Sequence, residues 1–126
     1  MMLLCASLLA LSGCSAPSTT DSEGHLLLVN PEKPADRPTA RVAGDLALVG
    51  DHCFGLDMGD LGTRAVVFPA GSRITADDRV DIPGLGTLSL GEAIDGGGGY
   101  VASAVAPVTV PSDCAAGEVA ILNPFN

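Results

Sequence analysis

The chain is poor in aromatic and basic residues. Its 126 residues include no Trp, one Tyr and three Phe, and only six Lys and Arg against fifteen Asp and Glu. Sugar-binding platforms need exposed aromatic faces, so the composition disfavours a lectin. The formal net charge of −9 would be repelled by a phosphate backbone and by anionic headgroups. We therefore expect no nucleic acid partner and no membrane attachment through a basic patch.

The sequence also lacks the residue set of a nucleophilic catalytic site. His25 and His52 are the only histidines, and neither a Gly-x-Ser-x-Gly nor a Gly-x-Gly-x-x-Gly motif occurs. Pairs of Asp and Glu could still serve glycoside hydrolysis, although a domain of this size rarely encloses a substrate cleft. We expect a protein that is not an enzyme and needs no cofactor. A small carboxylate-based hydrolase is the alternative.

An apolar run opens the chain and ends at Leu11-Ser12-Gly13-Cys14. As a helix, the run of about 11 residues would measure roughly 16 Å, which is too short for a bilayer span but suits the hydrophobic part of a secretory signal. This segment resembles a bacterial lipoprotein signal peptide with its lipobox. The resemblance implies cleavage after residue 13, acylation of Cys14 (for example with palmitate) and display on the extracytoplasmic face of the cell membrane. No Lys or Arg precedes the run, and an upstream start codon would supply the missing charge.

Four cysteines are present, and two of them remain for the folded part. Cys5 would leave with the signal peptide and Cys14 would carry lipid, which leaves Cys53 and Cys114 in a compartment where disulfides persist. Pairing them would close a loop of about 60 residues and stabilise the fold by roughly 4 kcal/mol through loop-closure entropy. Two unrelated buried thiols are one alternative. A zinc site that adds His52 and His25 is another, although the spacing matches no known metal-ligand pattern.

Residues 14–40 are expected to form the lipidated start and a proline-containing tether. Pro31, Pro34 and Pro38 favour extended polyproline II and forbid a helix. One part of this range, residues 25–29, is too apolar for a plain linker. We expect it to be a short packing segment, or else an edge strand or the cover of an apolar groove.

Residues 41–126 are expected to form a disulfide-closed all-β domain. Short apolar segments alternate with turns rich in Gly, Pro and Asp, and no window shows sustained helical periodicity. The expected strands cover residues 42–49, 53–58, 63–68, 73–75, 79–82, 87–90, 100–110 and 119–122. Six to eight such strands predict a small barrel or sandwich.

Two features of this domain suggest ligand sites. Gly96, Gly97, Gly98 and Gly99 predict a flexible loop whose N–H groups, together with Tyr100, could meet a ligand. The clustered acids suggest a calcium-stabilised module, although no calcium-loop motif occurs and turns attract Asp for their own hydrogen bonds. These acids are Asp51, Asp57, Asp60, Asp77, Asp78 and Asp81.

About two thirds of the chain resembles the small lipoproteins of unassigned function from high-G+C Gram-positive, actinobacterial species. The resemblance lies in GDLALVGDHCFGL, VVFPAGS, LGEAIDGGGG and VPSDC, at residues 44–56, 66–72, 90–99 and 110–114. It implies that Cys53 pairs with Cys114 and names no substrate. We expect a cell-envelope binding or structural module whose partner is an envelope protein or a small ligand, with the membrane reached only through the lipid.

Overall fold

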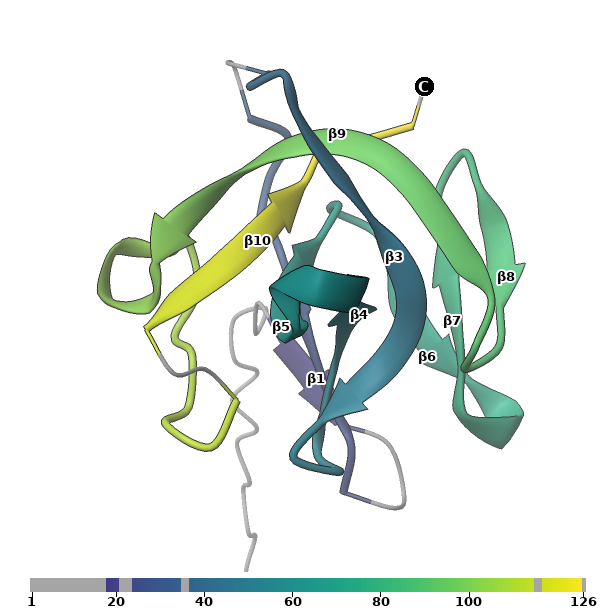
Figure 1. Cartoon of the computed structure of the whole chain (residues 1–126). Helices are drawn as coiled ribbons and strands as arrows, with labels where there is room; N and C mark the ends of the chain where they lie inside the picture. The colour runs from purple at the N-terminus through teal and green to yellow at the C-terminus, as the bar shows by residue number, and fades with distance from the viewer. Residues whose placement is uncertain (1–17, 21–23, 35–36, 115–116, 126) are drawn as a thin grey trace, which may run out of the picture.

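The computed structural model describes residues 18–20, 24–34, 37–114 and 117–125. Almost every regular element in this part is a strand (Figure 1). The strands are β1 (Ser18–Thr20), β2 (Leu26–Val29), β3 (Ala40–Val49), β4 (Cys53–Asp57), β5 (Thr63–Phe68), β6 (Arg73–Thr75), β7 (Arg79–Ile82), β8 (Gly86–Leu88), β9 (Ala93–Ala102) and β10 (Glu118–Leu122). Three short 3₁₀ turns complete the set: η1 (Gly59–Leu61), η2 (Ala76–Asp78) and η3 (Ser103–Val105). The predicted all-β class is confirmed.

The larger sheet has the order β1-β2-β4-β3-β9-β10-β5, and β5 also pairs with β2 and β4. These pairings connect the strands from β2 round to β5 in a closed circuit. β6, β7 and β8 form a separate antiparallel sheet beside it. The domain is therefore sandwich-like, and seven of the eight strands β3 to β10 lie close to the ranges expected from the sequence. β9 is the exception: it begins at Ala93 and ends at Ala102, and η3 follows where a strand was expected to continue to residue 110.

Part of the range expected as a tether belongs to the sheet. β2 pairs with β1, β4 and β5, and both Leu27 and Leu28 are fully buried. The apolar residues 25–29 therefore supply an interior strand, and the folded domain begins before Arg41. No helix in the described ranges is long and apolar enough to cross a membrane.

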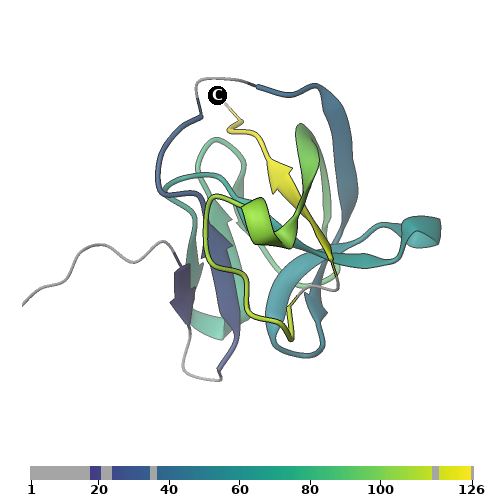
Figure 2. The same ribbon diagram turned by 90° about the vertical axis from the view of Figure 1, so that its left-hand side faces the viewer.

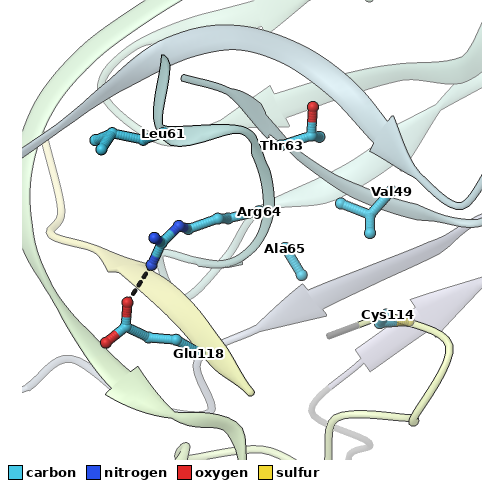
Figure 3. A pocket seen from close by; sticks show the side chains of 7 residues that line it. All are labelled: Val49, Leu61, Thr63, Arg64, Ala65, Cys114 and Glu118. Carbon is cyan, nitrogen blue, oxygen red and sulfur yellow. Dashed lines mark hydrogen bonds and ion pairs between the residues drawn. The ribbon is translucent and has the colours of Figure 1, made fainter. Parts of the chain in front are cut away.

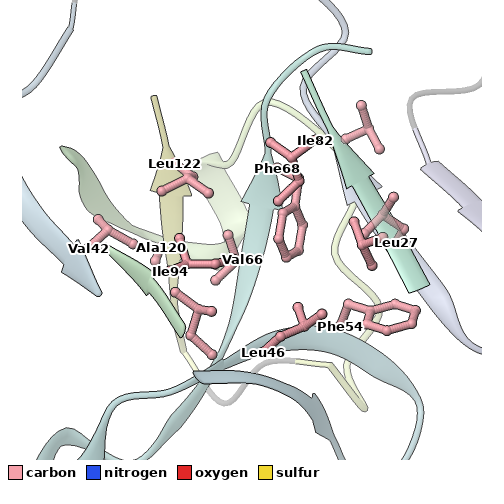
Figure 4. Close-up of a cluster of buried hydrophobic side chains, with 13 residues drawn as sticks. Leu27, Val42, Leu46, Phe54, Val66, Phe68, Ile82, Ile94, Ala120 and Leu122 are labelled. Atoms are coloured by element: carbon pink, nitrogen blue, oxygen red, sulfur yellow. The ribbon is translucent and has the colours of Figure 1, made fainter. Parts of the chain in front are cut away.

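The domain has two hydrophobic clusters, on opposite faces of the same strands. The larger lies within the circuit of strands (Figure 4); for example, β5 contributes Val66 and Phe68 to it. The smaller cluster lies on the outer side. The alternate residues of β5, Ala65 and Val67, belong to it together with Val108. Burial on both faces explains why these strands are continuous apolar runs instead of alternating ones.

Residues 103–114, which follow β9, cover the second cluster. They include η3 and cross the outer face of the sheet (Figure 2). The disulfide between Cys53 and Cys114, with 5.5 Å between their Cα atoms, joins this segment to the start of β4. The predicted disulfide is confirmed, and it closes the domain over this cluster.

The glycine run at residues 96–99 is not a loop. All four glycines lie inside β9, which pairs with β3 along its first half and with β10 along its second. The prediction of a flexible loop is wrong because neighbouring strands approach too closely for side chains. A Cβ on Gly98 would lie 1.8 Å from the carbonyl oxygen of Ile121, and one on Gly96 would lie 3.0 Å from the Phe125 ring.

Candidate functional site

An apolar groove runs along the outer side of β9 and β10. Its volume is about 530 Å³, within the range of small-molecule sites in proteins. Its lining comes from three parts of the chain: Pro34 and Pro38 before β3, Gly99 and Ile121 in β9 and β10, and Val105 of η3. Val105 is 70% exposed and therefore accessible to a ligand. Its lining is mostly apolar, with Asn30, Glu32 and Asn123 as the polar exceptions beside Tyr100.

Glycine keeps the groove open. A Cβ on Gly99 would meet Pro38 at 3.4 Å, an ordinary van der Waals contact, and one on Gly97 would lie 3.4 Å from Nδ2 of Asn123. The backbone of β9 is therefore bare on this side, while Gly96 and Gly98 are needed for packing elsewhere. Of the five residues predicted to bind a ligand, Gly99 and Tyr100 line the groove.

Tyr100 is held in place from two directions. Its hydroxyl donates a hydrogen bond of 2.9 Å to the carbonyl oxygen of Arg41. The guanidinium of Arg64 lies 5.5 Å from the ring centroid, within the range of a cation–π contact. Arg64 also pairs with Glu118. The ring therefore packs toward the larger cluster and Arg64, and Tyr100 lines the groove from the strand that also carries Gly99.

Asn123 fastens the proline segment to the strands. Its Nδ2 donates to the carbonyl oxygen of Pro38 at 2.7 Å, and its backbone N–H donates to Gly97 at 2.9 Å. Its Oδ1 is buried and has no hydrogen-bond partner within the described residues. Glu32, which also lines the groove, places a negative charge at its rim. The sequence did not point to this wall, because a proline-rich stretch is also typical of a plain linker.

A second hollow lies beside the disulfide. Cys114, Arg64 and Glu118 line it, with Leu61 at the edge, and its volume is about 270 Å³ (Figure 3). The imidazole of His52 lies nearby, with Nε2 3.8 Å from Oδ2 of Asp113. His25 lies elsewhere: its Nδ1 is 3.2 Å from Oδ1 of Asp78, and its ring meets Phe54 edge-on. The structure thus separates the two histidines of the zinc alternative.

Most of the clustered acids have structural roles in turns. Asp51, Asp77 and Asp78 have positive φ angles of 58°, 68° and 57°, a conformation that Asp tolerates better than most residues. Oδ1 of Asp57 accepts a hydrogen bond of 3.0 Å from the N–H of Gly59. Oδ1 of Asp81 accepts one of 3.1 Å from Thr87. The bond of Asp57 is the local one expected of a turn residue, whereas the bond of Asp81 joins β7 to the paired residue of β8.

Three carboxylates share a shallow hollow of about 380 Å³, lined by Asp45, Asp57 and Asp95. Arg41 donates two hydrogen bonds to Asp95, of 3.1 and 2.9 Å. These bonds, reinforced by the positive charge, lower the pKa of Asp95 and raise that of Arg41. A general acid in glycoside hydrolysis needs the opposite shift, so Asp95 is unsuited to that role.

Cys14, the residue expected to carry lipid, lies outside the described residues. Comparison of the chain with protein-family models, with curated proteins and with solved structures finds no match. Its function must therefore be argued from its own residues.

Proposed function

We propose that this chain is a lipid-anchored, extracytoplasmic binding module of the cell envelope, and that the groove beside β9 is its binding site. The groove is the single observation that supports binding best. Its size, its apolar walls and its few polar groups are the usual features of a small-ligand site. The address rests on the lipobox at residues 11–14 and fits a domain closed by a disulfide.

The walls define the chemistry of the ligand. Two prolines, Val105 and Ile121 offer dispersion contacts. Glu32 at the rim and the formal net charge of −9 repel anions. The site therefore suits a neutral apolar group, presented by a small molecule or by a side chain of an envelope protein.

Catalysis is the weaker candidate. The hollow with three carboxylates is open, and the pKa of Asp95 is lowered by Arg41 where a general acid would need it raised. A binding role asks only for the shape and polarity that the groove has.

Titration of the isotopically labelled protein with a set of small neutral apolar fragments tests the binding site. We expect amide chemical-shift changes that centre on Gly99, Val101 and Ile121. Val105→Asp, which adds a charge at the rim, should weaken the best fragment about tenfold or more, because a bound apolar fragment would remove water from the carboxylate without replacing its hydrogen bonds. Leu61→Asp changes another exposed aliphatic side chain, 63% accessible and outside the groove, and should leave the affinity unchanged. Shift changes confined to other surfaces would refute the assignment.

A further inference from the structure

The disulfide lies within a cluster of metal-ligating side chains. The sulfurs of Cys53 and Cys114 and a ring nitrogen of His52 all lie within 4.8 Å of one another. Asp113 extends the cluster, since Oδ2 is 3.8 Å from Nε2 of His52 and Oδ1 is 4.0 Å from Sγ of Cys114. In the part of the chain that the structure describes, this is the group of His and Cys side chains that converges closely enough for one ion.

Two dipeptides that the fold brings together supply these donors. His52 directly precedes Cys53, and Asp113 directly precedes Cys114. Two thiolates, an imidazole and a carboxylate together form a tetrahedral donor set that Zn²⁺ accepts in proteins. Sequence spacing hides this set, because 61 positions separate the two cysteines and the fold alone brings them together.

While the disulfide is intact, its sulfurs are bonded to each other and offer no thiolate to a metal. We propose that reduction of the Cys53–Cys114 disulfide converts this cluster into a zinc site, with Cys53, Cys114, His52 and Asp113 as ligands. The zinc bridge then holds the segment after β9 to β4 in place of the covalent bond. Residues 103–114 would thereby stay packed over the second hydrophobic cluster in both redox states.

The cluster lies next to solvent. Cys114 is itself buried but lines the open hollow of about 270 Å³ beside the sheet (Figure 3), so a small reductant in this hollow would lie close to its sulfur. The side chains of His52 and Asp113 are 35% and 66% exposed, so an ion can meet them before it reaches the buried sulfurs. The hollow that admits a reductant and the side chains that would bind the ion thus lie at the same end of the domain.

The redox step needs a dithiol reductant. One of its thiolates attacks Sγ of Cys114, the disulfide bond breaks, and Cys53 leaves as a thiolate that takes up a proton. The second thiol of the reductant then attacks the mixed disulfide and releases Cys114, and the reductant ends as a disulfide. Zinc binding afterwards displaces the protons of the two cysteine thiols.

Cobalt provides a direct spectroscopic probe of the reduced site. The full chain is reduced with a metal-free phosphine and titrated with Co²⁺. One equivalent should produce thiolate-to-cobalt charge-transfer absorption and the visible bands of a tetrahedral site, and Zn²⁺ should displace it. The oxidised chain should show neither feature. His52→Ala should weaken binding about tenfold or more, while His25→Ala, which changes the other histidine, should bind like the wild type.

Two results would overturn the proposal. One is binding by the reduced chain that is no stronger than by the oxidised chain. The other is equal binding by His52→Ala and the wild type, which would mean that the cysteines capture metal without a built site. If the reduced chain loses its strand circular dichroism without metal, Zn²⁺ should restore it, and failure to do so would also refute the zinc bridge.

Discussion

At the scale of single residues, several glycines inside the strands of this domain act through their missing side chain. Gly98 and Gly55 have ordinary backbone angles, yet a Cβ would lie 1.8 Å from the carbonyl oxygen of Ile121 in one case and 2.1 Å from that of Arg64 in the other. Strands of this small domain therefore pass one another at distances that only glycine permits. Gly99 differs, because its missing side chain leaves the groove open.

The two neighbouring glycines should respond differently to the same substitution. Gly98→Ala forces backbone apart and should lower the free energy of unfolding by about 2–4 kcal/mol. In Gly99→Ala the added Cβ meets only Pro38, at an ordinary distance. The free energy of unfolding should change by less than about 1 kcal/mol, because the reduced freedom of the unfolded chain offsets the small contact. Urea unfolding of both variants measures the difference. Equal losses would contradict the packing described for β9.

The ion pair of Arg41 and Asp95 gives a pH dependence with a defined sign. Hydrogen bonds from Arg41 lower the folded-state pKa of Asp95 from its ordinary 3.8, so the pair stabilises the fold above that pH. Its contribution is lost as the pH falls through the lowered pKa. Asp95→Asn should therefore melt slightly below the wild type near neutral pH, and the difference should vanish in acid. A difference that grows on acidification would contradict this assignment.

At the scale of elements, strands buried on both faces organise the domain. β2, β5 and β10 each send alternate residues into the two hydrophobic clusters. The apolar runs that result, such as residues 26–29 and 65–68, have no two-residue alternation. β5 was still predictable because Pro69 and Gly71 follow it, whereas β2 lies between stretches that are typical of linkers.

Leu27→Ala tests whether β2 is structural. Leu27 is fully buried in the larger cluster, so its truncation should cost about 2–5 kcal/mol of unfolding free energy. Leu61→Ala, at an exposed leucine in η1, should cost less than about 0.5 kcal/mol. Denaturant unfolding of the two variants provides the comparison. A neutral effect of Leu27→Ala would mean that residues 18–30 are a tether after all.

The sequence predicted elements better than it predicted the site. Turn residues mark the ends of most strands from β3 to β10, and these marks are local. The groove instead combines the proline segment, β9, η3 and the end of β10, which are far apart in the chain. Its wall depends on Asn123 reaching Pro38, a contact across 85 positions that no local pattern indicates.

At the scale of the whole molecule, the disulfide connects the fold with the proposed address. It joins residues 61 positions apart, so loop-closure entropy assigns it about 4 kcal/mol, a large share of the stability of a small domain. Such a bond persists in an oxidising compartment. The lipobox that we propose at residues 11–14 would deliver the chain to such a compartment.

The intact mass of the protein extracted from membranes of cells that express it tests this account most directly. We predict the mass of residues 14–126 plus covalently bound lipid, with a gain of two hydrogens when the Cys53–Cys114 disulfide is reduced. Cys14→Ser should abolish the lipid and release the protein from the membrane fraction. A wild-type chain that still carries residues 1–13, has no lipid and contains free thiols would contradict the central claim.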